Sequence, residues 1–217
     1  MDLVLYLFDL FLHLDKHLYT LVTEYGTWSY LILFTVIFCE TGLVITPFLP
    51  GDSLLFAAGA IAALGALRVE WLIALLIVAA IAGDTLNYAV GHFIGPRALT
   101  SNNRFLKKEY MDRTQRFYEK HGGKTIILAR FVPIVRTFAP FLAGVGIMSY
   151  SRFVVYNVVG GVVWVVLFTL AGYFFGNLAF VEKNFSLVIL AIIFLSLVPA
   201  VVEIWRDRRQ QQNATKA

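Results

Sequence analysis

The sequence has only one cysteine, Cys39, and charged residues make up just 15% of its 217 positions. A single cysteine excludes a disulfide framework within the chain and a metal site built from several cysteines. Hydrophobic residues reach 59% and the mean hydropathy is +0.74, which is too apolar for a soluble domain of this length. Composition therefore predicts an integral membrane protein.

Basic residues are few, and they are clustered rather than spread over a surface. Eight of the eighteen Lys and Arg residues lie between Arg97 and Lys124, and Arg206, Arg208 and Arg209 follow the last apolar segment. Clusters beside apolar segments are typical of cytoplasmic loops in membrane proteins. The net charge of +4 is therefore better explained by cytoplasmic loops than by binding to a nucleic acid. The cluster after the last apolar segment predicts a cytoplasmic C-terminus.

The N-terminus lacks the basic start of a cleaved signal peptide, because Asp2 and Asp9 occupy that region. Polar residues near helical spacing instead predict an interfacial amphipathic helix within residues 1–27. His13 and His17 lie four positions apart, as in some metal sites, but no third ligand is evident. We predict a solvated helix face there, with no metal and no cofactor.

Two stretches place charged residues beside helix breakers inside apolar sequence. The first, within residues 28–67, carries Glu40 and Asp52; the second, within 125–148, carries Arg130 and Arg136. Backbone freed by proline inside a membrane persists only where protein or a water-filled cavity supplies partners. Both stretches are therefore predicted to be re-entrant helical hairpins, broken at Pro47, Pro50, Gly51, Pro133, Pro140 and Gly144.

Two short motifs that each occur twice indicate that the chain is an inverted repeat. Pro47-Phe-Leu-Pro-Gly51 and Pro140-Phe-Leu-Ala-Gly144 match at four of five positions, with an offset of 93 (140 − 47). Gly91-His-Phe-Ile-Gly95 and Gly172-Tyr-Phe-Phe-Gly176 are the second pair, offset by 81 (172 − 91). The predicted fold is all-α: each hairpin is followed by a transmembrane helix, with spans at 71–95, 152–176 and 185–205. A basic connector covers 96–124, and a cytoplasmic tail covers 206–217.

The charged residues suit phosphate binding and proton transfer. Arginine presents a planar fork that matches phosphate oxygens, so Arg130 and Arg136 are candidate ligands of a phosphate headgroup. Glu40 and Asp52 could take up and release protons in a low-dielectric site. In the span 71–95, Asp84, Asn87 and Tyr88 share one helical face and form either a structural cluster or a secondary site. The simpler alternative is that the acids only neutralise the arginines.

Several of these motifs together resemble the bacterial DedA family, over nearly the whole chain. They are Glu40-Thr-Gly, Phe48-Leu-Pro-Gly-Asp-Ser53, Gly122-Gly-Lys-Thr, Arg130-Phe-Val-Pro-Ile-Val-Arg136, Ala143-Gly144, Met148, Phe153, Asn157 and Trp164. The family's VTT domain is similar to that of eukaryotic lipid scramblases.

The resemblance implies a lipid transporter of the bacterial inner membrane. The proposed activities of the family are undecaprenyl phosphate recycling and phospholipid scrambling, linked in some members to proton motive force. The functional acidic pair of the family falls on Glu40 and Asp52, and its arginine pair on Arg130 and Arg136. The same resemblance adds Asn157 to the residues of the possible secondary site, Asp84, Asn87 and Tyr88.

Three functions from other classes remain alternatives. A lipid phosphatase would want a nucleophile beside a base or a metal, and no Gly-x-Ser-x-Gly or His-Glu-x-x-His motif occurs. We therefore predict no enzymatic activity. A proton-coupled ion or drug exchanger could use the same acids, and a membrane-protein assembly factor would need none of the four charges. The expected partners are membrane lipids and protons, and a homo-oligomer is compatible with the sequence.

Overall fold

The computed structural model describes residues 14–43, 51–100, 115–116, 118–119, 121–179 and eight positions between 181 and 192. For residues 14–16, 94–100 and 133–134 it describes the backbone only. Within these ranges the chain is helical, with no strand. The predicted span 185–205 lies mostly outside them, and so do Pro47, Pro50, the connector's residues 101–114 and His13.

The first half of the molecule consists of α2 (Leu14–Tyr25), α3 (Trp28–Gly42) and α4 (Gly51–Ala63). Leu18 and Val22, one turn apart, are buried where α2 packs on α4. Residues 51–62 of α4 are buried on every side. A helix that is apolar all round belongs in a core or a membrane, and α4 lies in the core against α9.

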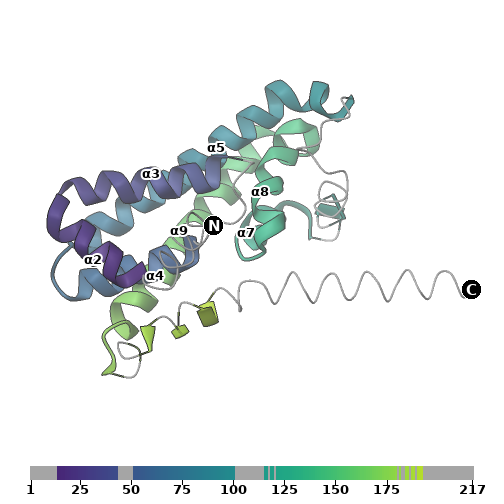
Figure 1. Ribbon diagram of the computed structural model, residues 1–217. Helices are drawn as coiled ribbons and strands as arrows, with labels where there is room; N and C mark the ends of the chain where they lie inside the picture. The colour runs from purple at the N-terminus through teal and green to yellow at the C-terminus, as the bar shows by residue number, and fades with distance from the viewer. Residues whose placement is uncertain are drawn as a thin grey trace, which may run out of the picture.

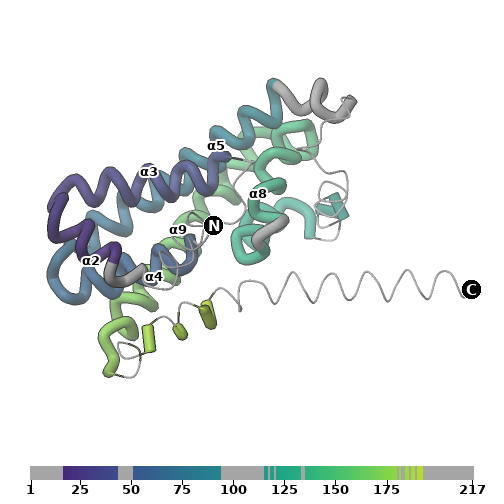
Figure 2. Tube along the Cα trace, viewed as in Figure 1, coloured from purple at the N-terminus to yellow at the C-terminus, as the bar shows by residue number. Residues whose placement is uncertain are grey.

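Two long helices, α5 (Val69–Thr100) and α9 (Tyr150–Phe175), run side by side along the molecule (Figures 1 and 2). Each contains an apolar stretch long enough to cross a membrane, Val69–Phe93 and Tyr150–Phe175. The helix α5 continues five residues beyond the predicted end at 95 and passes through Pro96. A proline removes one helical hydrogen bond, which bends a helix without always ending it.

The second broken stretch contains η1 (Gly122–Lys124), α7 (Thr125–Ala129), α8 (Pro133–Leu142) and a π-helical turn, η2 (Ala143–Ile147). Pro133 begins α8, a position that suits its fixed φ and missing N–H. Pro140 lies inside α8, so the prediction of a break at this residue is wrong. The chain turns instead within residues 130–132 and again after Gly144, at Gly146, whose φ is 132°.

Two antiparallel crossings bring helix backbones into direct contact. Gly59 of α4 packs on the carbonyl of Thr169, and Gly172 of α9 packs on the carbonyl of Phe56. Side chains would keep these helices apart, and a Cβ at either glycine would collide with backbone. The two glycines therefore let the backbones of α4 and α9 touch.

The crossing between α5 and the α8–η2 segment has the same construction. Gly144 packs on the carbonyl of Tyr88, and Gly91 packs on that of Phe141. Phe56 and Gly59 thus correspond to Phe141 and Gly144, with an offset of 85 (144 − 59), while Gly91 corresponds to Gly172. The predicted pairing of the 47–51 and 140–144 pentads is displaced by eight residues from this correspondence (93 − 85).

Buried apolar residues form two clusters along the spans. One gathers residues of α2, α3 and α4 with Leu72, Leu76 and Trp164, and the other gathers α7 and α8 with Tyr88 and Phe153. The buried charged side chains, Glu40, Asp52, Asp84 and Arg130, come from the same helices or from the turns beside them. The fold thus positions a polar centre where the two apolar clusters meet.

Candidate functional site

Glu40, near the end of α3, accepts hydrogen bonds from two donors on other segments. Its Oε1 accepts the backbone N–H of Gly51, the first residue of α4, at 3.0 Å, and it also accepts from Nη2 of Arg136. Glu40 is only 4% exposed. A Cβ at position 51 would overlap the buried Glu40 carboxylate, so this glycine lets the carboxylate lie directly against the start of α4.

Asp52, in the first turn of α4, shares the same arginine. Its Oδ1 lies 3.3 Å from Nη1 of Arg136 and accepts the indole N–H of Trp164 at 2.7 Å. A carboxylate in the first turn of a helix also meets the positive end of the helix dipole. One guanidinium therefore joins two carboxylates that come from the ends of α3 and α4.

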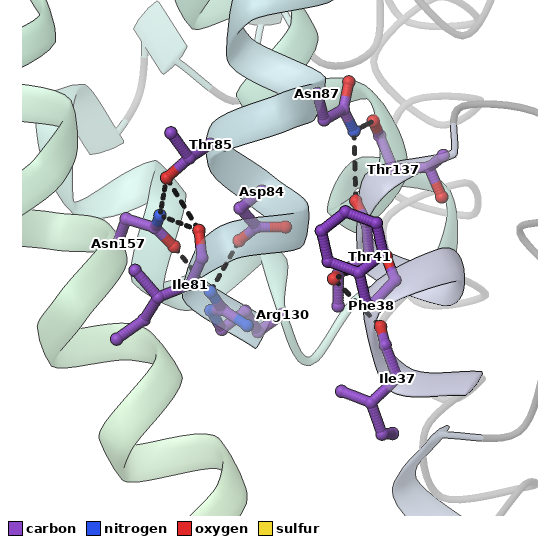
Figure 3. Close-up of polar contacts among 10 residues, drawn as sticks. All are labelled: Ile37, Phe38, Thr41, Ile81, Asp84, Thr85, Asn87, Arg130, Thr137 and Asn157. Carbon is purple, nitrogen blue, oxygen red and sulfur yellow. Dashed lines mark hydrogen bonds and ion pairs between the residues drawn. The ribbon is translucent and has the colours of Figure 1, made fainter. Parts of the chain in front are cut away.

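Arg130 has different partners from those expected. Its Nη2 lies 2.5 Å from Oδ2 of Asp84 in α5 and donates to Oδ1 of Asn157 in α9 at 2.7 Å. Asn157 in turn donates to the Ile81 carbonyl at 3.1 Å, and Asp84 and Asn157 approach Arg130 from two different helices (Figure 3). Arg130 thus ties both long helices to the turn between α7 and α8.

Trp164 connects the two arginines, and the sequence assigned it no role in the site. The guanidinium carbons of Arg130 and Arg136 lie 5.7 and 5.4 Å from the centroid of its fully buried ring. These distances fall within the range of cation–π attraction. The available signal was a tryptophan among the motif residues, but spacing alone could not show that it meets arginines 28 and 34 positions earlier.

Asn87 and Tyr88 lie beside this centre and hold the broken segments in place. Asn87 is fully buried and donates to the carbonyls of Thr41 at 3.3 Å and Thr137 at 2.9 Å (Figure 3). The Tyr88 hydroxyl donates to the Met148 carbonyl at 3.0 Å. Hydrogen bonds from α5 therefore satisfy carbonyls in and beside the interrupted helices.

The centre as a whole contains three carboxylates and two guanidiniums, a formal charge of −1 (2 − 3). Among the described residues, Nε and Nη1 of Arg130 and Oε2 of Glu40 are buried without a hydrogen-bond partner. Over the same part of the chain, no group of three His, Cys, Asp or Glu side chains could hold a metal ion. The buried centre therefore has polar atoms without a hydrogen-bond partner in addition to its net charge.

This fold defines an all-helical membrane protein with two long apolar helices, α5 and α9, and a buried ionic centre that links them to the shorter helices. Residues 49–174 match the VTT domain. The chain is 55% identical to Protein DedA of Escherichia coli (strain K12) over 219 residues that cover all of both chains. The chain belongs to the DedA family of membrane proteins.

More distant relatives agree with this assignment. An uncharacterized membrane protein of Mycobacterium tuberculosis (strain ATCC 25618 / H37Rv) is 46% identical over 185 residues, which cover 84% of this chain and 81% of the relative. Inner membrane protein YqjA of Escherichia coli (strain K12) is 33% identical over 187 residues, 82% of this chain and 85% of its own. These names are consistent with a location in the inner membrane. No solved structure matches the chain.

Proposed function

We propose that this protein transports a lipid with a phosphate-bearing headgroup across the bacterial inner membrane. One observation carries the proposal: an anion seat, made by the Gly51 N–H and the Arg136 guanidinium, is filled by the protein's own Glu40 carboxylate. Helix N-terminal amides and arginine forks are the donors that phosphate groups also bind. A phosphate can therefore compete with Glu40 for the same donors.

In the proposed cycle, a headgroup phosphate displaces the carboxylates from Arg136. Arg130, fixed by Asp84 and Asn157 on the other side of Trp164, adds positive charge without leaving its own partners. Glu40 and Asp52 lose their strongest partner at that moment, and taking up protons restores neutrality. The exchange couples headgroup binding to proton uptake, while the lipid tail stays in the bilayer.

The transported lipid in this proposal is undecaprenyl phosphate. A phosphate monoester offers more free oxygens to two arginines than the diester of an ordinary phospholipid does. General phospholipid scrambling by the same centre is the second candidate, because the Arg136 seat would also accept a diester oxygen. The two candidates differ in which labelled lipid moves.

The proposed topology is an inverted repeat of two re-entrant hairpins. In each repeat the first arm packs mainly on the following long helix, α3 on α5 and α7 on α9. The second arm packs on the long helix of the other repeat, α4 on α9 and α8 on α5. Transporters with inverted repeats place their sites where such broken helices meet. The C-terminus is assigned to the cytoplasm.

Lipid transport by the purified protein in liposomes tests the function. We expect Arg136→Ala and Asp52→Asn each to slow movement of labelled undecaprenyl phosphate at least about tenfold, the loss of one charge-assisted hydrogen bond. Arg68→Gln is the matched control, since Arg68 is exposed between α4 and α5. Thermal unfolding of each variant shows that the fold persists.

The same liposomes separate the alternatives. Unchanged lipid movement in both Arg136→Ala and Asp52→Asn contradicts the assigned roles. Release of inorganic phosphate from the lipid indicates a phosphatase, which our proposal excludes. A pH change that an ion gradient drives when no candidate lipid substrate is present favours an exchanger. A function that survives neutralisation of all four charges but not changes in residues 97–124 favours an assembly factor.

A further inference from the structure

A cleft of about 450 Å³ lies beside the first turn of α9. It has the size of a site for a small ligand or a headgroup. Its walls come from described residues between 115 and 123, the end of η2 and the start of α9, and the lining residues used below are Tyr118, Glu119, Gly123, Arg152 and Tyr156. None of the five charged residues of the buried centre lines it.

Two opposite charges line this cleft without pairing with each other. Arg152 and Glu119 are both exposed, and no ion pair joins them in the part of the chain that the structure describes. The Glu119 carboxylate accepts a hydrogen bond from Gln115 at 3.4 Å. Exposed opposite charges that face one cleft but remain apart leave room for a ligand carrying both signs.

The aromatic wall of the cleft is held firmly. A Cβ at Gly123 would collide with the Tyr156 ring, so the backbone lies flat against that ring. Tyr118 is buried and donates its hydroxyl to the Ala139 carbonyl at 2.9 Å. Burial raises the pKa of the Tyr118 phenol above its ordinary value, so the hydroxyl remains a donor. Aromatic faces near a carboxylate are a favourable environment for an ammonium group.

The cleft also lies at the depth of lipid headgroups. The 26 residues of α9 extend about 39 Å at 1.5 Å per residue, more than the hydrocarbon thickness of about 30 Å. The first turn of α9 therefore reaches the headgroup layer on one side of the membrane. Tyr156 immediately precedes Asn157, which accepts a hydrogen bond from Arg130, so the cleft lies next to the buried centre.

From this geometry we propose that the cleft binds the phosphate–ammonium headgroup of a zwitterionic phospholipid. Arg152 binds the phosphate, and Glu119 binds the ammonium against the Tyr156 ring. This is a second lipid site, distinct from the Arg136 seat, and it does not depend on the function proposed for that seat. It holds a membrane lipid beside the buried centre without transporting it.

Binding of soluble headgroups to the full-length protein in detergent tests the proposal. The probes are glycerophosphoethanolamine, glycerophosphoglycerol and inorganic phosphate, followed by saturation-transfer NMR. We expect glycerophosphoethanolamine to bind most tightly. Arg152→Gln and Glu119→Gln should each weaken it about tenfold, which corresponds to about 1.4 kcal/mol.

Lys124→Gln is the matched control, because it removes an exposed charge next to Gly123 without lining the cleft. In an Arg136→Ala background, Arg152→Gln and Glu119→Gln should still weaken glycerophosphoethanolamine binding about tenfold, which separates this site from the proposed transport seat. Equal binding of all three probes, or an effect of Arg152→Gln without one of Glu119→Gln, would show a simple anion site and overturn the proposal. Arg152 and Glu119 are both exposed, so neither substitution should unfold the protein. If one variant does unfold, the headgroup binding of the other variant tests the proposal.

Discussion

Arg130 and Arg136 carry the same charge six positions apart, yet their surroundings give them different tasks. Arg130 is 2% exposed and is held by Asp84 and Asn157 from two long helices. The Arg136 side chain is 10% exposed and holds Glu40 and Asp52 at the junction of α3 and α4. The first arrangement ties two long helices to the turn before α8, and the second is the one that we propose exchanges its anions.

The arrangement around Arg130 predicts a difference between single and double substitutions. Asp84→Asn leaves the buried Arg130 charge uncompensated and should destabilise the protein by about 3–5 kcal/mol. Asp84→Leu combined with Arg130→Met removes both charges and should recover most of that loss. Denaturant unfolding in detergent measures both, and a stable Asp84→Asn protein would contradict the role of this arrangement.

The indole N–H of Trp164 gives a second prediction. Trp164→Phe keeps an aromatic ring between the arginines but removes the donor to Asp52, a bond to a charged group that contributes about 1.5–3 kcal/mol. We expect lipid transport to fall about tenfold or more. The control is Trp71→Phe, an exposed tryptophan on α5. Transport at the unmodified rate in Trp164→Phe would remove Trp164 from the site.

Individual site residues could be found in the sequence, but their pairing could not. Ionisable side chains are costly in apolar segments, so Glu40, Asp52, Asp84 and both arginines were recognisable from composition. Which carboxylate meets which guanidinium depends on how the helices rotate and pack. Local spacing carries no such information, and Arg130 therefore meets Asp84 rather than Glu40 or Asp52.

At the scale of the helices, the glycine crossings predict that a Gly→Ala substitution lowers stability instead of raising it. Replacing glycine by alanine inside a helix normally stabilises it by about 1 kcal/mol. At Gly172 the new methyl group would meet the Phe56 carbonyl, so we expect Gly172→Ala to destabilise by about 1–3 kcal/mol. Gly91→Ala should do the same against Phe141, and a rise in thermal stability of either variant would contradict the close crossings.

The two broken apolar stretches were visible in the sequence, but the pairing predicted between their pentads differs from the correspondence of the helix crossings. The pentads ending at Gly51 and Gly144 are similar in sequence, yet the two glycines have different neighbours. Gly51 makes room for a carboxylate, whereas Gly144 makes room for a helix backbone. The better signal was Phe-x-x-Gly at 56–59 and 141–144, because a residue three positions before a glycine lies on the same helical face.

For the whole molecule, we expect the two ends of the long helices to lie on opposite sides of a membrane. Leu18 and Phe185 belong to one buried cluster, so Tyr19 and Asn184 lie near the same end. Ser149 precedes α9 at the other end. With Cys39 replaced by serine, single cysteines at Tyr19 and Asn184 should react from one side of the membrane and one at Ser149 from the other. All three reacting from one side would contradict the crossing by α9.

The sharing of one guanidinium by Glu40 and Asp52 sets a limit on the stoichiometry of the proposed exchange. When an incoming anion captures Arg136, both acids lose it in the same event, while the Gly51 N–H still donates to Glu40 and the Trp164 indole still donates to Asp52. Two proton sites are thereby created for each headgroup bound. Turnover should accordingly carry at most two protons through this centre per lipid.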